Sequence, residues 1–501
     1  MRDLLKTTFT IILFSVTTKV IGFFFRWYLS RMLGAEMMGV YQVAFSVFIV
    51  FLVTVTSGIP ITVTSLTARS QFDFNIKQGS AVGAAVIINL IVGLAAVFVV
   101  IFFGNVWRAI FTNPLSYNIL LMLMPAVVFS SIGDAYKGNV WGKKHYFAVS
   151  CIELIEQTVR IIICIVLFIF AQDSIVRASL AALSLSFACG VSSLIMIFYY
   201  RKLGGQTLAP LGHLKQVFQM STPITIMRVS SALVNFLIAV LVPNRLIASG
   251  LNNSQAMEIY GSSVGMSMGF LFAPITLTGA LAVALVPRLN EEYECKKMDA
   301  LGNTAKNAIN FSIIAAFLFI PMFLALGQDI GLFIYKNQLS GEFLAKSSII
   351  IIVLTIEHIT SSMMNSMGLQ FKSFVNYYIG TAILVVCIWF LTPWLRIDAL
   401  IIGLGVSNAV SVVLHIYHIK KLTNMKLGFL KTLGLNLAFL IPSGALAYSL
   451  NMLLKNAPDF WRLFVSAGAA VLSIFFLNVC FNLLDISAFF SFKKSRLKQR
   501  I

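Results

Sequence analysis

Residues 81–103 read AVGAAVIINLIVGLAAVFVVIFF, an apolar run that contains no charged side chain. The hydrocarbon core of a bilayer is about 30 Å thick, and an α-helix needs about 20 residues to cross it. Transmembrane β-strands would instead alternate apolar and polar residues over shorter segments, and this run does not. We therefore predict a membrane-spanning helix at 81–103.

Runs of the same kind follow one another along the whole chain. They predict an all-α, polytopic membrane protein with about 14 transmembrane helices. The predicted spans lie near 7–30, 40–65, 81–103, 117–136, 148–171, 176–199, 216–243, 262–286, 307–327, 344–370, 374–394, 399–419, 430–453 and 461–484. No small-residue cleavage site follows the first run, so we expect an uncleaved helix there rather than a signal peptide.

The composition excludes other classes of protein. Hydrophobic residues make up 59% of the 501 residues, and charged residues make up 11%, against roughly 25% in a typical soluble protein. A disordered chain would be poor in large apolar residues, whereas this chain has 43 Phe. Its six cysteines form no C-x-x-C pair, so we expect neither a disulfide framework nor a bound metal or cofactor.

The distribution of charge predicts the topology. The 37 Lys and Arg outnumber the 18 Asp and Glu, and most of these basic residues fall on the side of the membrane that holds the amino terminus. Since basic loops stay in the cytoplasm, we expect both termini there, in contact with anionic lipid headgroups rather than with nucleic acid. The chain has no nucleotide-binding G-x-x-x-x-G-K-[ST] motif and no H-E-x-x-H motif, so we expect a transporter and not an enzyme.

Four basic residues instead lie within apolar runs, namely Lys19, Arg26, Arg160 and Arg228. A charge at the bilayer centre costs at least about 2.5–3.5 kcal/mol, so such residues usually face a bundle interior or a water-filled cavity. Lys19 and Arg26 are two helical turns apart and share a face. Lys19 and Arg228 each lie about 12 residues, or roughly 18 Å, into their predicted helices. We predict that Lys19, Arg26 and Arg228 bind an anionic headgroup; alternatively, backbone carbonyls satisfy these cations, or Arg26 extends to the interface.

Acidic residues within apolar runs are candidates for other roles. Glu156 precedes Arg160 by one turn, a spacing that favours a structural ion pair within one helix. Glu357 lies near the middle of the run at 344–370. It is a candidate for coupling transport to a proton or another cation, or alternatively a buried acid held by hydrogen bonds.

Small residues recur every four positions at the start of the run at 262–286, which predicts close packing against another helix. They are Gly261, Gly265 and Gly269.

The chain also shows a weak internal repeat. Tyr41 precedes Arg69 by the same number of residues as Tyr260 precedes Arg288. Six helices repeated in the same orientation predict two lobes related by a pseudo-two-fold axis along the membrane normal, with Arg69 and Arg288 as candidates for the cavity mouth. We predict an N-lobe at 1–205, a C-lobe at 206–425, and two further helices with a basic tail at 426–501.

Motifs in several predicted helices resemble those of one transporter family. They are KVIGFFFR at 19–26, LSRMLGAEMMGVYQ at 29–42, EQTVR at 156–160 and LVPR at 285–288. The family is the polysaccharide-transporter branch of the multidrug/oligosaccharidyl-lipid/polysaccharide exporter superfamily, with greatest similarity to its MurJ-type lipid II flippases. The resemblance covers nearly the whole chain, and Lys19 falls where the family has a basic residue.

The resemblance implies a V-shaped pair of six-helix lobes around a cationic cavity. It also implies alternating access, which moves an undecaprenyl-pyrophosphate-linked glycan from the inner to the outer leaflet of the bacterial cytoplasmic membrane. The cargo would be a lipid II-like precursor for the cell wall or the spore cortex. We expect a monomer whose partners are this lipid-linked glycan and membrane lipids.

Other functions stay open at this point. A MATE-like exporter of cationic drugs is expected to carry acids in its first lobe, where Lys19 and Arg26 occur instead. The cargo of a flippase could also be another lipid-linked polysaccharide precursor. A membrane enzyme such as a glycan polymerase would need a larger outer loop with carboxylates or histidines, and a scaffold would have little reason to keep cations at mid-depth.

Overall fold

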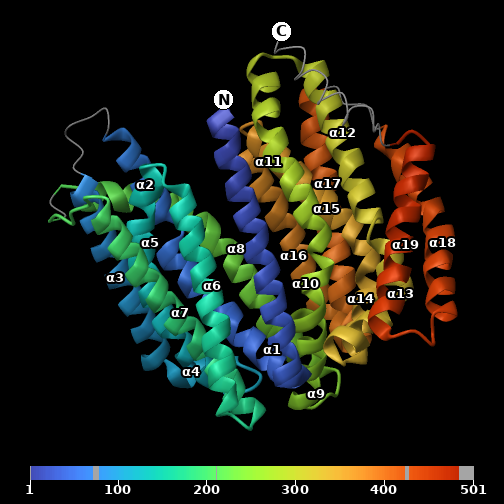
Figure 1. Cartoon of the computed structure of the whole chain (residues 1–501), viewed down its shortest axis with the longest axis horizontal. Coiled ribbons are helices and arrows are strands. Elements are labelled where there is room, and N and C mark those ends of the chain that lie inside the picture. The colour runs from blue at the N-terminus through green and yellow to red at the C-terminus, as the bar shows by residue number, and fades with distance from the viewer. Residues whose placement is uncertain (1, 71–77, 210–211, 424–427, 484–501) are drawn as a thin grey trace. The chain divides into compact units, whose positions relative to one another are not determined.

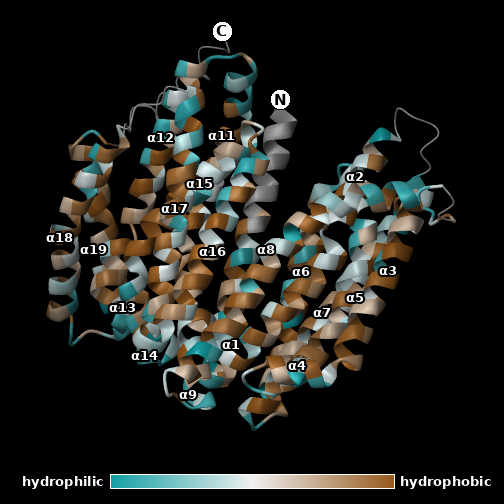
Figure 2. Cartoon of the chain, turned by 180° about the vertical axis from the view of Figure 1, so that it is seen from behind, coloured by the Kyte–Doolittle hydropathy of each residue, from teal (hydrophilic) through white to brown (hydrophobic). Residues whose placement is uncertain are grey.

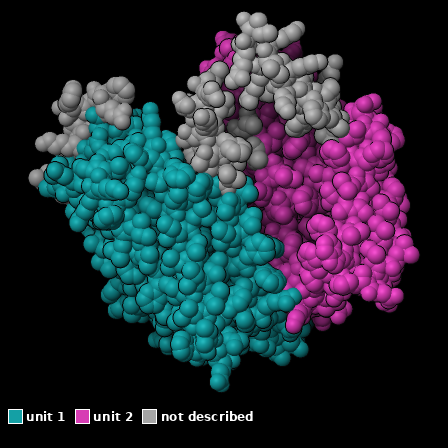
Figure 3. Space-filling view, in the orientation of Figure 1, with its two compact units in different colours: residues 1–266 teal, residues 267–501 magenta. Residues whose placement is uncertain are grey.

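The computed structural model describes residues 2–70, 78–209, 212–423 and 428–483. Within these ranges the chain is helical and forms no strand, which confirms the all-α prediction (Figure 1). The chain divides into two compact units, unit 1 at residues 1–266 and unit 2 at residues 267–501 (Figure 3).

Within the described residues, unit 1 is built from long helices and three shorter ones of 7, 8 and 12 residues. Its helices are α1 (Arg2–Thr56), α2 (Gly58–Arg69), α3 (Gln78–Phe102), α4 (Gly104–Ile110), α5 (Leu115–Gly142), α6 (Tyr146–Ile169), α7 (Ser174–Lys202), α8 (Leu214–Ala248) and α9 (Asn253–Tyr260). A π-helical segment, η1 (Gly261–Ser267), follows α9 and leads into unit 2.

Unit 2 begins with one four-residue helix and ends with a hairpin of two long helices. Its helices are α10 (Met268–Leu271), α11 (Ala273–Glu294), α12 (Met298–Phe317), α13 (Ile320–Tyr335), α14 (Gln338–Ser347), α15 (Ile351–Ser366), α16 (Gln370–Leu395), α17 (Asp398–Thr423), α18 (Phe429–Leu453) and α19 (Asp459–Cys480). A single 3₁₀ turn, η2 (Ser348–Ile350), joins α14 to α15.

Eleven helical stretches among the described residues are long and apolar enough to cross a bilayer. This number is consistent with about 14 predicted spans, because Val16–Arg69 contains the first two of them and the runs at 148–171 and 262–286 form α6 and the η1–α10–α11 segment. Hydrophobic residues dominate the long helices, while hydrophilic residues gather near helix ends and loops (Figure 2). The chain is therefore a multi-pass membrane protein.

A kink in α1 separates the first two predicted spans. Gly34 has φ 75° and ψ 173°, which is not helical, and it divides Arg2–Thr56 into two helices. Glycine adopts a positive φ without the steric cost that a Cβ would bring. The first two predicted spans are therefore helices that meet at Gly34 without a loop between them, and the second continues past Thr56 into α2.

Glycines allow α1 to pack closely on α9 and η1. A Cβ atom on Gly261 would overlap the carbonyl oxygen of Ala35, and one on Gly39 would overlap the carbonyl oxygen of Met257. By contrast, the position of a Cβ on Gly269 has open space around it. The predicted small-residue packing thus occurs at the start of the glycine series and does not extend to its end.

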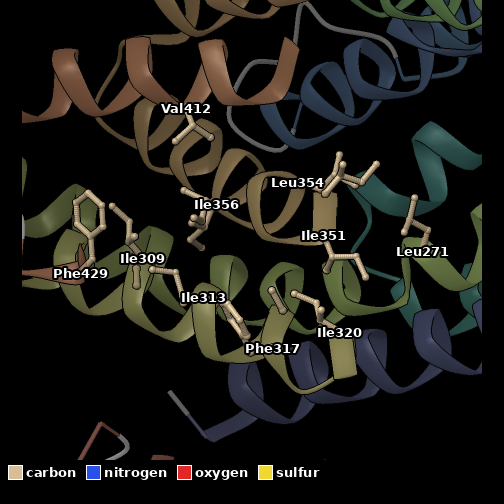
Figure 4. Packing of buried hydrophobic residues seen from close by; sticks show 14 of the residues in the cluster. Leu271, Ile309, Ile313, Phe317, Ile320, Ile351, Leu354, Ile356, Val412 and Phe429 are labelled. Atoms are coloured by element: carbon tan, nitrogen blue, oxygen red, sulfur yellow. The ribbon is translucent and has the colours of Figure 1, made fainter. Parts of the chain in front are cut away.

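Each unit has its own packed interior. In unit 1, Val63, Leu66 and Ala85 pack with Tyr136 and Tyr200, whose ring centroids lie 5.0 Å apart. In unit 2, a larger cluster lies around α12 and α15 and includes Ile309, Ile313, Phe317 and Ile351 (Figure 4). Lipid tails are as apolar as these side chains, so close van der Waals packing holds the helices together more than exclusion of water does.

The C-terminal hairpin is joined by a buried pair of amides. Asn436 of α18 donates to Asn478 Oδ1 at 3.0 Å, and Asn478 of α19 donates back to Asn436 Oδ1 at 2.8 Å. Both side chains are fully buried. Because each amide satisfies the other where no water is available, the pair sets the register of α18 against α19.

The compact units differ from the predicted lobes at one boundary. Unit 1 ends at residue 266 and includes α8 and α9, which the repeat assigned to the C-lobe at 206–425. The lobes were defined by the repeat and not by compactness. The division into 1–205, 206–425 and 426–501 therefore stays a prediction.

Candidate functional site

Arg26 is held by protein groups within unit 1. Its Nε donates to the carbonyl oxygen of Gly265 at 2.6 Å, and its Nη2 donates to the carbonyl oxygen of Val264 at 2.9 Å and to Gln42 Oε1 at 3.1 Å. The side chain is partly buried. A planar guanidinium suits this fork of acceptors. Arg26 therefore ties α1 to η1, which corresponds to the carbonyl-satisfied alternative considered from the sequence.

Lys19 and Arg228 are in a different situation. Both side chains are exposed, and no hydrogen bond or ion pair of either is found in the part of the chain that the structure describes. Lys19 belongs to α1 and Arg228 to α8, and these two helices pack against each other in unit 1. Of the three cations predicted to bind an anion, these two are the exposed ones, and their binding of an anion stays a prediction.

The interpretation of Glu156 and Arg160 as an ion pair differs from the structure. Arg160 Nη2 donates to the hydroxyl of Tyr41 at 3.2 Å, and its guanidinium lies 4.4 Å from the ring centroid of Phe25. The carboxylate of Glu156 instead accepts a hydrogen bond from Cys189 Sγ, with 3.9 Å between sulfur and oxygen. A spacing of one helical turn places the two side chains within reach of each other, but neighbouring helices offer each of them another partner. Arg160 keeps a structural role, through α1 rather than through its own helix.

A charged cluster between α5 and α6 was missed in the sequence. Lys137 Nζ lies 2.6 Å from Glu153 Oε1 and 3.8 Å from Asp134 Oδ1, and Glu156 follows Glu153 by one turn of α6. Lys137 comes directly after the predicted span at 117–136, but it lies inside α5 with a side chain only 19% exposed. Two acids in an apolar run next to a basic helix end were the signal that could have revealed it. No group of three His, Cys, Asp or Glu side chains in the described ranges is arranged to hold a metal ion.

The two cavity-mouth candidates lie in different units. Arg69 is exposed in the last turn of α2, where a cation is favoured by the helix dipole. Arg288 of α11 forms an ion pair with Glu292, at 2.8 Å between Nε and Oε1. Glu292 also accepts from Thr304 Oγ1 at 3.1 Å. Arg288 therefore helps to link α11 to α12, and a place for either residue at a cavity mouth stays a prediction.

Glu357 lines a polar pocket that lies wholly within unit 2. The pocket has a volume of about 400 Å³ and is formed by α11 and α15. Its other polar wall groups come from His358, Ser361, Ser362 and Asn365. The sequence had marked Glu357 alone, because single hydroxyls and amides in an apolar run give little signal until the helix face is known.

The structure thus separates two chemistries. In unit 1, exposed cations suit an anion, and the acids of α5 and α6 are largely taken up by Lys137. In unit 2, one carboxylate lies among neutral hydrogen-bonding groups in a pocket.

Known proteins are similar to this chain over most of its length. The family model described as polysaccharide biosynthesis protein matches residues 4–291, which is more than half of the chain. Stage V sporulation protein B of Bacillus subtilis (strain 168) is 22% identical over 494 residues, which cover 95% of this chain and 95% of that protein.

Solved structures share the fold at lower identity. The lipid II flippase MurJ, in an inward closed conformation, superposes with a TM-score of 0.71 at 14% identity and covers 94% of this chain and 98% of its own. An inward-facing multidrug resistance MATE family transporter of the MOP superfamily superposes with a TM-score of 0.67 at 14% identity and covers 82% and 96%. These similarities confirm the family resemblance predicted from the motifs.

Proposed function

The chain belongs to the polysaccharide biosynthesis protein family, and from that premise we propose that it is a flippase for a lipid-linked glycan precursor. The cargo is an undecaprenyl-pyrophosphate-linked glycan, such as a lipid II-like peptidoglycan precursor, used for the cell wall or the spore cortex. It moves from the inner to the outer leaflet of the bacterial cytoplasmic membrane by alternating access. The protein acts as a monomer with both termini in the cytoplasm. Similarity to a sporulation protein and to a lipid II flippase supports this proposal.

The observation that carries the proposal is the pair of exposed cations, Lys19 and Arg228, on apolar helices of unit 1. A cation in a membrane span costs free energy unless it faces a polar path or a counter-charge. A pyrophosphate would supply that counter-charge, since ammonium and guanidinium groups form charge-assisted hydrogen bonds with phosphate oxygens. The polyprenyl tail can stay in lipid, so only the charged head needs such a path.

The test is leaflet exposure of a lipid-linked glycan in reconstituted vesicles. Each cation is expected to contribute a charge-assisted hydrogen bond of about 1.5–3 kcal/mol, which corresponds to at least about a tenfold change in rate. We expect Lys19→Ala and Arg228→Ala each to lower the translocation rate by that factor or more. Both variants should insert and fold normally, because neither side chain has a described protein partner to lose.

The matched control is Lys372→Ala, which removes an exposed lysine near the start of α16 in unit 2. This variant should translocate at the wild-type rate. Wild-type rates in both the Lys19 and the Arg228 variants would rule out the cationic path. Failure of the wild-type protein to expose any lipid-linked glycan would rule out the flippase itself.

A second candidate function is export of organic cations, as in a MATE-like transporter. The acids Asp134, Glu153 and Glu156 of unit 1 favour it, since carboxylates attract cationic drugs. Lys137 neutralises part of that charge through its contacts with Asp134 and Glu153, so we place this function second. Uptake of a fluorescent organic cation by inverted vesicles distinguishes the two: transport of the cation without transport of lipid-linked glycan would reverse the order.

A further inference from the structure

The polar pocket of unit 2 has one hydrogen-bonding wall and one wall of small residues. Glu357, Ser361 and Asn365 follow one another at intervals of four residues along α15, so they share a helix face. His358 and Ser362 lie beside them. The opposite wall is formed by Gly279, Ala282 and Val286 of α11. The polar face extends over about 12 Å of helix, at about 1.5 Å per residue.

Two side chains of the polar wall contact other protein groups, and three have no described protein partner. Ser361 shares a hydrogen bond with Ser373 at 3.1 Å, and His358 faces Thr278 Oγ1 at 3.4 Å. For the side chains of Glu357, Ser362 and Asn365, no hydrogen bond or ion pair is found within residues 2–70, 78–209, 212–423 and 428–483. Polar groups within a membrane span are costly unless they bind something. The pocket therefore offers a carboxylate, a hydroxyl and an amide to a ligand.

The chemistry of these groups identifies the ligand class. A carboxylate accepts hydrogen bonds, an amide both donates and accepts, and a hydroxyl does either. Together they complement the hydroxyl and acetamido groups of a sugar, while the C–H face of a sugar ring fits a wall of small apolar residues. None of the described residues that line the pocket is a lysine or an arginine, so the pocket does not suit a phosphate. Its volume of about 400 Å³ exceeds what a single ion needs, and it lies in the range of small-molecule sites.

We propose that the pocket between α11 and α15 binds a neutral sugar of the transported glycan, through Glu357, Ser362 and Asn365. This inference rests on the proposed flippase function and adds recognition of the glycan to it. The pocket of unit 2 distinguishes a glycosylated lipid from a bare one. Glu357 acts in this scheme as a hydrogen-bond acceptor rather than as an ion-coupling group.

The experiment compares two lipids on the full-length protein in nanodiscs. One is undecaprenyl pyrophosphate, and the other is the same lipid carrying an N-acetylated disaccharide. Wild-type protein should bind the glycosylated lipid more tightly, by at least about tenfold, the equivalent of one or two hydrogen bonds. Asn365→Leu and Glu357→Leu should each lower this preference about tenfold and leave binding of the bare lipid unchanged, which also shows that the variants fold.

Two further variants sharpen the outcome. Ser366→Ala changes a hydroxyl on the same helix that bonds to the carbonyl of Ser362 and does not line the pocket; it should keep the wild-type preference. Glu357→Gln retains an acceptor of the same size without its charge, so it should keep most of the preference. If Glu357→Gln abolishes transport while every variant keeps the wild-type lipid preference, Glu357 couples ions and the sugar site is overturned.

The remaining outcomes separate this inference from the proposed function. A wild-type protein that binds and flips lipid-linked glycan, but whose Asn365→Leu and Glu357→Leu variants keep its preference, overturns the pocket and not the flippase. A wild-type protein that binds neither lipid overturns the flippase. In that case the free disaccharide is the probe: binding that Asn365→Leu abolishes still supports the pocket, and no binding overturns it.

Discussion

Replacing Arg26 tests whether this cation serves the fold or the cargo. The guanidinium donates to the carbonyl oxygens of Val264 and Gly265 and to Gln42, over 2.6–3.1 Å. Hydrogen bonds from a charged donor contribute about 1.5–3 kcal/mol each in soluble proteins, but polar contacts between membrane helices average nearer 0.6 kcal/mol. Between these bounds, we expect Arg26→Ala to lower the free energy of unfolding by about 2–4 kcal/mol.

Arg26→Lys should recover less than half of that loss. A lysine keeps the charge, but its single ammonium cannot reproduce the planar fork that serves both carbonyls. Global stability is measured by reversible unfolding in mixed micelles. Local stability is measured by hydrogen exchange of the peptide that covers η1, whose amides should exchange faster in Arg26→Ala than in the wild type.

Lys19→Ala is the matched control, since Lys19 lies two turns earlier on the same face of α1 and is exposed. It should leave both unfolding and exchange in η1 unchanged while lowering translocation. The reasoning fails if Arg26→Ala unfolds like the wild type, shows no faster exchange in η1, and yet loses translocation. Arg26 would then act on the cargo, as the sequence first predicted.

Two further predictions concern helix packing. Asn436→Leu or Asn478→Leu alone should destabilise the protein by about 1–3 kcal/mol, because the partner amide loses its hydrogen bonds. The double variant should recover most of that loss, which thermal unfolding of the wild type, the two single variants and the double variant measures as a double-mutant cycle. Additive losses would contradict the pairing. Gly261→Ala should lower the free energy of unfolding by about 1–3 kcal/mol, because the new methyl group would meet the carbonyl oxygen of Ala35. Gly269→Ala should be neutral or slightly stabilising, because the space at that position is open. Equal thermal stability of the two variants would contradict the close approach.

Most of the fold was predictable because the decisive property is local. A run such as 81–103 predicts a membrane helix from its own composition, since any charge within it would be costly. The boundary at Gly34 was visible as a break between two runs, but the positive φ that joins the two helices without a loop was not. Helix positions follow from short-range hydropathy, whereas helix breaks depend on how neighbouring segments pack.

The candidate site was predictable only in part. Intramembrane charge singled out Lys19, Arg26 and Arg228, but the same rule could not tell an available cation from a satisfied one. Lys137 escaped notice because it stands near a basic helix end, and its partner Glu153 lies on another helix. The pairing of Glu156 with Arg160 was inferred from spacing on one helix, which sets proximity but not the choice among competing partners.

The sequence by itself determined that this protein spans a membrane. It also determined the positions of the helices and identified the charged residues that lie within apolar runs. Those features follow from the free-energy cost of placing charge and unpaired polar backbone in hydrocarbon. Each segment avoids this cost through its own residues and its own helical hydrogen bonds. Only the tertiary structure decided what those charges do. Arg26 meets carbonyl groups more than 200 residues away in the chain, and the polar face of α15 that carries Glu357 becomes one wall of a pocket only where α11 forms the other. Such contacts depend on how helices pack, which local hydropathy does not encode.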